Sequence, residues 1–468
     1  LVDRTGRPAM RLDTNRRGTE LRVLTPQPAA RGSTRWIEAM RWRRDQTSGR
    51  VQAFYPLAPG PSPSLYYVAG RLAGADRVGI HLYDISARSF VRELFVHPEV
   101  DVDAALFDPR TGSYVGAAYW STMLDVSFVD AAMQKHYDGL KRYFGAGLNV
   151  QISGASDDQS VWLLHVSGPG DPGSFHIYDI KSARSTALRS VNKLLADLKL
   201  APAQPVSYAA SDGLVIRGYL TLPPGLAQGA RPPLIVYPHG GPEVRDVGGF
   251  HPVAQFLATR GYAVFQPNFR GSAGYGRSFA QAGRRQFGRA MQTDINEGID
   301  HLAAKGLADP DRVCILGESY GGYAALAGVS LYPERFRCAA SMAGLSDLYQ
   351  MMRWEEDQEG YSSPAYKYWL EQIGDPGKDR EEMEKYSPIK LIDRIKAPIL
   401  LFHGDKDVIV PIEQSEKMEK ALHSAGRNVR MIRFEEGGHS FDNETLLTYL
   451  KELESFFAQH LPATGSPG

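Results

Sequence analysis

Two hydrophobic rhythms divide the chain near residue 205. Before this point, short runs alternate apolar and polar residues between turn residues, which predicts antiparallel strands. Examples are SLYYVAGRL (64–72), VGIHLYDIS (78–86) and SVWLLHVSG (160–168). The similar segments HLYDISARS (81–89) and HIYDIKSARS (176–185) indicate an internal repeat of a strand and a polar turn. The repeat predicts that residues 1–205 form about four blades of a β-propeller, with a helix inserted at 130–144.

After residue 205 the pattern changes to strands that alternate with helices. Short apolar runs of the kind buried on both faces occur at 232–239, 262–267, 312–317, 337–344, 397–404 and 429–435. Amphipathic helical stretches lie between or after them at 293–306, 412–426 and 444–461. This alternation predicts a mostly parallel sheet covered by helices. Residues 206–462 are therefore expected to form an α/β domain, and residues 463–468 a flexible tail.

Length, charge and composition narrow the function classes. The 468 residues exceed the ~250–300 that one hydrophobic core usually serves, so two domains are expected. Basic and acidic residues both number 53, so no global field attracts nucleic acid or an anionic membrane. No run approaches the ~18 apolar residues of a membrane-spanning helix, which predicts a soluble protein. No metal-ligand pattern is present, and no metal or cofactor is expected.

The two cysteines bear on the cellular compartment. The first residues bear on where the polypeptide begins. Cys314 and Cys338 each lie in an apolar segment, which favours two buried free thiols over a bridge. Free thiols favour a reducing compartment, hence the cytoplasm over the periplasm. The chain opens on Leu1 and a polar run without a signal segment. We expect it to begin inside a longer polypeptide.

The segment ILGESYGGY (315–323) carries the first candidate for chemistry. It places Ser319 between glycines where a buried strand ends and an apolar helix begins. G-x-S-x-G at such a corner is typical of a nucleophile elbow, in which the tight turn leaves no room for Cβ atoms beside the serine. Ser319 is the predicted nucleophile.

A serine hydroxyl needs a base, and the base needs an acid to hold its tautomer. Both should follow the serine, in the order acid and then histidine. In LLFHGDKDVIVP, Asp405 and Asp407 compete for the acid position, and Asp407 is favoured because the chain can turn before the carboxylate points back. His439, in EEGGHSF, follows a strand between glycines and is the predicted base.

The negative charge that develops on the substrate oxygen requires backbone donors. The segment YPHGGP (237–242) follows the first strand of the α/β domain and offers the N–H groups of Gly240 and Gly241. The second donor is expected to be the N–H of Tyr320, the residue after the nucleophile.

With these parts in order, the second half of the chain resembles the prolyl oligopeptidase family of serine peptidases, nearest its acylaminoacyl-peptidase branch. The resemblance is carried by YPHGGP, NFRGSAGYGRSF (268–279), GESYGGYAAL (317–326), KYSPIKLIDRIKAPILLFHGDKDVIVPIEQS (385–415) and GGHSF (437–441). It implies an α/β-hydrolase domain capped by a β-propeller, with Ser319, Asp407 and His439 on the triad positions. It also implies seven blades, so the propeller here is expected to be N-terminally incomplete.

Two departures from the family pattern bear on substrate binding. Several relatives have an arginine two residues after the triad acid, where this chain has Ile409, so the substrate must be positioned otherwise. Relatives that release dipeptides use paired glutamates on a propeller segment. Glu355 and Glu356 lie in the hydrolase half, and that role is not transferred to them.

The resemblance implies hydrolysis of short or unstructured peptides through an acyl-enzyme, with the propeller as a size filter. Three alternatives stay open: an isopeptidase that opens lasso-type peptides, a carboxylesterase, and a non-enzymatic module that binds through its propeller. A peptide substrate is the expected partner. A homo-oligomer, or association with the missing part of the chain's own propeller, is compatible with the sequence.

Overall fold

A computed structural model describes residues 1–2, 5–15, 20–28, 34–43, 54–72, 74–196, 198–440 and 442–463. Residue contacts divide the chain into two units. The first comprises Leu1–Ala196, Gly274–Ser278 and Tyr361–Tyr368, and the second Asp197–Ala273, Phe279–Gly360 and Trp369–Gly468. The boundary after residue 205 stays a prediction, and residues 464–468 of the predicted tail lie outside the described residues.

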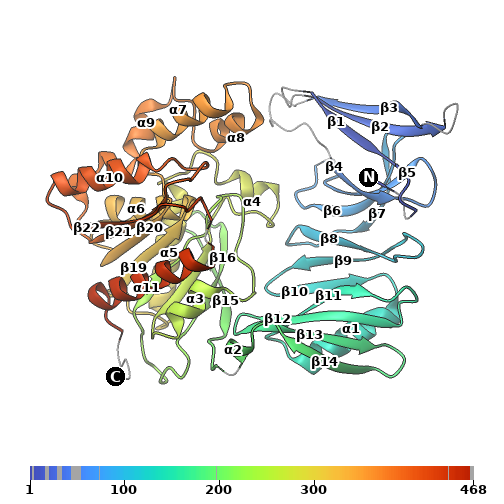
Figure 1. Cartoon of the computed structure of the whole chain (residues 1–468), viewed down its shortest axis with the longest axis horizontal. Helices are drawn as coiled ribbons and strands as arrows, with labels where there is room; N and C mark the ends of the chain where they lie inside the picture. The colour runs from blue at the N-terminus through green and yellow to red at the C-terminus, as the bar shows by residue number, and fades with distance from the viewer. Residues whose placement is uncertain are drawn as a thin grey trace. The chain divides into compact units, whose positions relative to one another are not determined.

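The N-terminal part of the chain forms separate antiparallel sheets, as its alternating pattern predicts (Figure 1). The first two sheets contain β1 Arg11–Thr14, β2 Glu20–Pro28 and β3 Thr34–Arg43, then β4 Phe54–Pro59, β5 Leu65–Gly70, β6 Gly79–Asp84 and β7 Ser89–Phe95. The next two contain β8 Val102–Phe107, β9 Tyr114–Trp120 and β10 Leu124–Phe128, then β11 Asn149–Ala155, β12 Val161–Gly168, β13 Asp171–Asp179 and β14 Arg184–Ser190. The short α2 Lys193–Ala196 follows.

The predicted inserted helix is confirmed as α1 Ala131–Phe144. The carboxylate of Asp130 caps its N-terminus by accepting hydrogen bonds from two backbone N–H groups. Tyr137 and Leu140 of this helix are buried in one cluster with Trp162 of β12. Alternate residues of β12 are buried in the same cluster, which is the period of a strand with one buried face.

The C-terminal part is built on a sheet with the strand order β15-β16-β18-β17-β19-β20-β21-β22. The six strands from β18 to β22 in this order are parallel to one another, and β15 and β16 pair in antiparallel fashion at one edge. The strands are β15 Ala203–Ala209, β16 Val215–Thr221, β17 Leu234–Val236, β18 Ala263–Asn268, β19 Val313–Glu318, β20 Cys338–Met342, β21 Ile399–Gly404 and β22 Val429–Phe434. The helices are α3 Pro252–Ala258, α4 Arg277–Gln281, α5 Ala290–Ala304, α6 Tyr320–Leu331, α7 Leu348–Glu359, α8 Pro364–Gln372, α9 Arg380–Lys385, α10 Glu413–Ser424 and α11 Asn443–His460, with 3-10 turns at Pro388–Lys390 and Ile392–Arg394. The predicted strand and helix alternation is confirmed.

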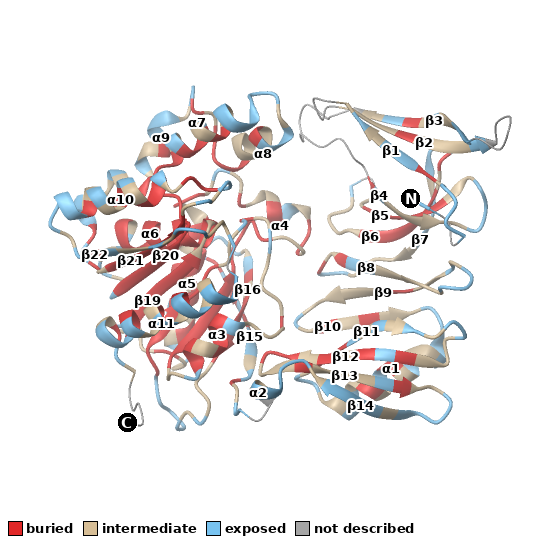
Figure 2. Ribbon diagram, viewed as in Figure 1, coloured by how far each residue is buried: buried red, intermediate tan, exposed pale blue. Residues whose placement is uncertain are grey.

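Helices cover the parallel strands on both faces, so these strands are almost wholly buried (Figure 2). Every residue of β18, β20 and β21 is buried. This burial explains why their sequences read as continuous apolar runs rather than as alternating ones. Within the described residues, no helix is long and apolar enough to cross a membrane.

The prediction of two free thiols is wrong, because Cys314 and Cys338 form a disulfide. Cys314 in β19 lies directly opposite Cys338 in β20, and their Cα atoms are 4.8 Å apart. Side chains at paired positions of neighbouring strands point to the same face, which brings the two sulfur atoms together. The disulfide removes the reason for expecting a reducing compartment.

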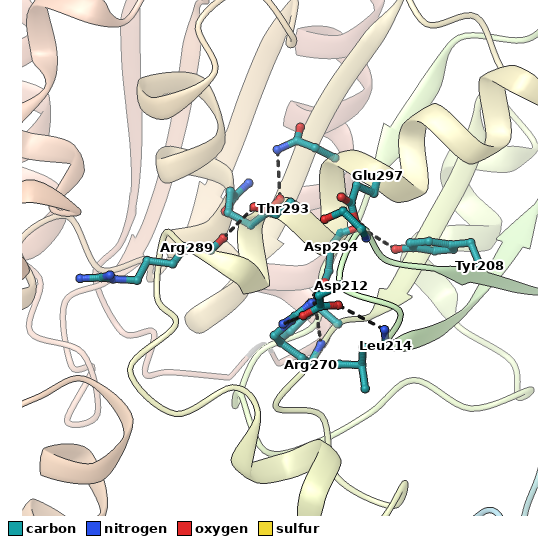
Figure 3. A network of polar contacts seen from close by, with 12 residues as sticks. Tyr208, Asp212, Leu214, Arg270, Arg289, Thr293, Asp294 and Glu297 are labelled. Atoms are coloured by element: carbon teal, nitrogen blue, oxygen red, sulfur yellow. Dashed lines mark hydrogen bonds and ion pairs between the residues drawn. The ribbon is translucent and has the colours of Figure 1, made fainter.

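An ion-pair network centred on the buried Arg270 joins three segments of the α/β domain (Figure 3). The guanidinium of Arg270, after β18, donates to the carboxylate of Asp294 in α5 at 2.8 Å and to that of Asp212 at 2.7 Å. Its hydrogen bonds with Asp294 raise the pKa of Arg270 above its ordinary value. Tyr208 of β15 donates its hydroxyl to the backbone carbonyl of Asp294. The network fixes α5 against the antiparallel edge of the sheet.

Replacing Asp294 by alanine is expected to lower the free energy of unfolding of the α/β domain by about 3–5 kcal/mol, because it leaves the Arg270 charge buried without its main partner. Urea denaturation measures the loss. Asp300→Asn is the matched control on the same helix, since Asp300 pairs with Arg335 but its side chain is 65% exposed. The control should cost less than about 1 kcal/mol. Equal losses in the two variants would contradict the assignment.

Candidate active site

Ser319 occupies a strained turn between β19 and α6. Its backbone has φ 57° and ψ −120°, a conformation that residues with a side chain rarely adopt. The Ser319 N–H donates to the carbonyl of Met342 at 2.8 Å, which ties the turn to the end of β20. This is the conformation expected of a nucleophile elbow.

The glycines around Ser319 are required by packing. A Cβ on Gly317 would lie 2.1 Å from the carbonyl oxygen of Gly321, so strand and helix could not meet. A Cβ on Gly321 would lie 2.1 Å from the carbonyl oxygen of Pro238. The start of α6 is therefore packed directly against the loop that contains Gly240 and Gly241.

Asp407 and His439 are brought together from the ends of β21 and β22. The Nδ1 of His439 lies 2.7 Å from Oδ2 of Asp407. A carboxylate only accepts, so Nδ1 carries the proton and Nε2 is left as an acceptor. The N–H groups of Ile409 and Val410 donate to the other oxygen, Oδ1, at 2.8 and 3.0 Å.

The environment of Asp407 keeps it ionised. Burial raises the pKa of this carboxyl, but hydrogen bonds from His403, from His439 and from the N–H groups of Val410 and Ile409 outweigh that effect and bring the pKa below its usual range. A buried, negatively charged acceptor beside the imidazole stabilises the imidazolium that forms when a base takes a proton.

Asp405, the competing acid, points elsewhere. Its carboxylate accepts a hydrogen bond from Arg433 at 3.0 Å. Arg433 also pairs with Glu416 at 2.7 Å, and both pairs are partly exposed. The geometry thus assigns the contact with His439 to Asp407 rather than to Asp405.

His403 supports the acid loop and was missed by the sequence analysis. It is fully buried, and its Nε2 donates to the carbonyl of Val410 at 2.9 Å and lies 3.4 Å from Oδ2 of Asp407. Its Nδ1 meets the hydroxyl of Ser415 at 2.7 Å. A histidine inside an apolar strand, two residues before Asp405, is the signal that could have indicated it.

His239 fixes the loop that holds the predicted oxyanion donors. Its Nδ1 lies 2.8 Å from the carbonyl oxygen of Gly240, and a carbonyl only accepts, so Nδ1 is the donor. Burial lowers the pKa of His239 to about 4, so the ring is neutral at pH 7, and its Nε2 lies 2.9 Å from the hydroxyl oxygen of Ser272. The peptide held in this way is the one whose N–H belongs to Gly241.

An apolar pocket opens beside Ser319. It is lined by Gly241, Phe287, Ser319, Tyr320, Leu345, Met351, Trp369, Ile409 and Val410. None of these residues is charged. Ile409, which stands where the family resemblance would place an arginine in several relatives, is thus part of the pocket wall. The pocket brings Ser319 together with two of the predicted oxyanion donors, Gly241 and Tyr320.

Ser319 and His439 follow parallel strands of one sheet, whose carboxyl ends lie at the same edge. Burial raises the pKa of Glu318, next to the serine, although hydrogen bonds from Tyr237 and Tyr449 and the nearby His439 act in the opposite direction. Ser319 and His439, both among the described residues, form no direct hydrogen bond in this structure. Such bonds are often long in unliganded enzymes and shorten with substrate. The catalytic roles of the predicted site residues stay predictions. These residues are Ser319, Asp407, His439, Gly240, Gly241 and Tyr320.

Comparison with known proteins shows relatives over most of the chain. Residues 249–464 match the model of the Prolyl oligopeptidase family. The chain is 30% identical over 416 residues to dipeptidyl aminopeptidase BIII of Pseudoxanthomonas mexicana. The aligned region covers 86% of this chain and 59% of the relative. It therefore spans less than two thirds of this relative's length.

Solved structures share the fold at low identity. The acylaminoacyl peptidase of Pyrococcus horikoshii has a TM-score of 0.70 at 20% identity, covering 98% of this chain and 72% of that one. A puromycin-hydrolyzing peptidase of Mycobacterium tuberculosis has a TM-score of 0.71 at 22% identity, covering 96% and 70%. The predicted fold class, an all-β propeller region followed by an α/β-hydrolase domain, is confirmed. Residues 249–464, which include Ser319, Asp407 and His439, thus match the prolyl oligopeptidase family, and the chain is similar to peptidases of this family.

Proposed function

We propose that this chain hydrolyses short or unstructured peptides through an acyl-enzyme formed on Ser319. The Ser319 oxygen attacks the substrate carbonyl carbon while His439 Nε2 takes the hydroxyl proton. The N–H groups of Gly241 and Tyr320, or of Gly240, stabilise the negative charge on the carbonyl oxygen. Each such donor contributes about 10²–10³ in rate.

Collapse of the tetrahedral intermediate breaks the carbon–nitrogen bond. The imidazolium of His439 gives its proton to the departing amine, which leaves as the first product. A water molecule then loses a proton to His439 and attacks the acyl-enzyme, and the same proton returns to Ser319 as the acid product departs. Asp407 stabilises the imidazolium in both halves of the reaction.

The observation that carries this proposal is the hydrogen bond of 2.7 Å between His439 and Asp407. It leaves Nε2 as the acceptor that a serine nucleophile requires. The strained turn at Ser319 and the loop packed against it supply further support. The neutral pocket favours a substrate with an apolar side chain beside the cleaved bond.

The size limit on the substrate is part of the proposal. The propeller region is proposed to restrict access to the hydrolase site, so that a short peptide can reach Ser319 and a folded protein cannot. Digestion of a mixed peptide library and of a folded protein of the same composition, followed by mass spectrometry, tests this. We expect cleavage of the peptides alone.

Comparing kcat/KM on a peptide p-nitroanilide and on a short-chain p-nitrophenyl ester tests the reaction class. Turnover of both is expected, because ester and amide transfer share the same oxyanion. Turnover of esters without any anilide would favour a carboxylesterase. Cleavage restricted to a lasso-type isopeptide would favour an isopeptidase, and no turnover of any substrate would favour a binding module.

A further inference from the structure

Glu318 is a partly buried carboxyl group that directly precedes the predicted nucleophile and contacts two other segments of the α/β domain. Its Oε1 accepts a hydrogen bond from the hydroxyl of Tyr237 at 2.8 Å and a second one from the hydroxyl of Tyr449 at 3.2 Å. Both tyrosines are buried, with exposed fractions of 6% and 0%. A buried hydroxyl that loses its acceptor bears the full cost of its desolvation, so both contacts are favoured in the folded domain.

Each of the two tyrosines belongs to a segment with a predicted part in the chemistry. Tyr237 follows β17 directly and is the first residue of the segment 237–242, which carries the predicted glycine donors of the oxyanion site. Tyr449 lies in α11, and this helix begins four residues after His439. One oxygen atom of Glu318 therefore connects the turn at the nucleophile to the oxyanion segment and to the helix that follows the histidine loop.

Further contacts of the two tyrosine rings hold their hydroxyls in place. The ring of Tyr237 meets the ring of His251, the residue that caps α3, edge-on with centroids 5.3 Å apart. The ring of Tyr449 meets Phe402 of β21 in the same way at 4.7 Å. Packed side chains of this kind have little freedom to move. Glu318 is thus bound to two fixed points.

We propose that Glu318 is a positioning residue, which fixes the oxyanion segment and the helix after the histidine loop relative to the nucleophile through the hydroxyls of Tyr237 and Tyr449. This inference rests on the proposed peptidase function. Because Glu318 is joined to Ser319 by a peptide bond, contacts that fix its side chain also restrain the strained turn at Ser319. A displacement of about 1 Å at a catalytic group can lower a rate by about 10²-fold.

Loss of this positioning should affect chemistry more than binding. The oxyanion donors and the histidine act on the transition state, so their displacement lowers kcat rather than raising KM. The apolar pocket is formed by other side chains, such as those of Met351 and Trp369. Binding of the substrate side chain should therefore change little.

The kinetic test compares Glu318→Ala, Glu318→Gln, Tyr237→Phe and Tyr449→Phe with the control Tyr208→Phe on a peptide p-nitroanilide. Tyr208 is a matched control because it is also a buried tyrosine, whose hydroxyl donates to the carbonyl of Asp294 at 2.6 Å in the network of Figure 3. We expect kcat to fall on the order of 10²-fold in Glu318→Ala and on the order of tenfold in Tyr237→Phe and Tyr449→Phe, with KM within about threefold.

The conservative variant and the control decide whether hydrogen bonds to Glu318 are the cause. Glu318→Gln should keep kcat within about threefold of the wild type, since its amide oxygen still accepts from both hydroxyls. Tyr208→Phe should lower the melting temperature and leave kcat unchanged. A merely structural role would give unchanged kcat in Tyr237→Phe as well, and equal losses in Glu318→Gln and Glu318→Ala would show that the hydrogen bonds are not the cause. Either result would overturn the inference.

A second measurement tests the coupling of the two groups without turnover. Urea denaturation compares Glu318→Ala, Tyr237→Phe and the variant that carries both changes. The double variant should unfold at a urea concentration no lower than that of Glu318→Ala, because the second change removes a hydroxyl that has already lost its acceptor. If the two losses added instead, the groups would be independent and the inference would be wrong. The tyrosine variants remove one oxygen atom each, so they test the inference even if Glu318→Ala does not fold.

The two measurements also separate this inference from the proposed function. A wild type that hydrolyses the anilide, with kcat unchanged in Glu318→Ala and Tyr237→Phe, would overturn the role of Glu318 and leave the peptidase assignment intact. A wild type without activity on any peptide would contradict the proposed function. The urea midpoints would then still show whether Glu318 and Tyr237 are coupled.

Discussion

Replacing Ser319 by alanine is expected to lower kcat on a peptide p-nitroanilide by at least about 10⁴-fold, because it removes the atom that forms the acyl-enzyme. The pocket and the oxyanion donors do not depend on the hydroxyl, so KM should change little. Initial rates at saturating substrate measure the loss. The melting temperature checks that the fold is intact, and no large decrease is expected because alanine keeps the Cβ atom of Ser319 and can adopt the same backbone conformation.

Ser330→Ala is the matched control for the nucleophile. Ser330 lies in α6, the helix that starts directly after Ser319, and its buried hydroxyl donates to the carbonyl of Leu326. This variant should retain its activity and its labelling by a fluorophosphonate, whereas Ser319→Ala should lose both. Labelling that persists in Ser319→Ala would show that another residue is the nucleophile.

The strand and helix order of the α/β domain could be predicted because burial acts in the same way on each element. Parallel strands covered on both faces, such as β18 and β21, must be apolar throughout and so stand out from the amphipathic helices between them. The alternation in β12 reflects a single buried face in the same direct manner. Local sequence is sufficient wherever burial alone selects the residue.

Features that depend on pairing between distant segments could not be predicted in this way. The disulfide requires that Cys314 and Cys338 occupy opposite positions in neighbouring strands, and hydrophobic pattern does not give that register. The direction of an acidic side chain in a loop is equally hidden. Asp405 points to Arg433 because β22 lies beside it, which is a property of the folded sheet.

The supporting histidines illustrate the same limit. His239 and His403 both donate to backbone carbonyls, and each thereby fixes a loop that carries predicted site residues. The role of each histidine follows from the loop that it contacts. The sequence alone does not show which loop that is. The nucleophile and oxyanion loops are further coupled by the contact between Gly321 and Pro238, where even one methyl group does not fit.

Changing Asp407 to asparagine is expected to lower kcat by about 10⁴-fold while the fold is retained, because the change acts through the tautomer of His439. The N–H groups of Ile409 and Val410 would still require an oxygen at Oδ1. The amide nitrogen would then face Nδ1 of His439 and donate to it. The ring proton would move to Nε2, which could no longer accept the proton of Ser319.

Asp405→Asn separates this effect from a general loss of charge near the site. Asp405 is two residues away and pairs with Arg433 at a partly exposed position, so its loss should change kcat by less than about twofold. Fluorophosphonate labelling should slow in Asp407→Asn as well, since the serine needs the same base for that reaction. If instead Asp405→Asn were the inactive variant, the contact between Asp407 and His439 would have no part in catalysis. The proposal that Asp407 is the acid that orients His439 would then be wrong.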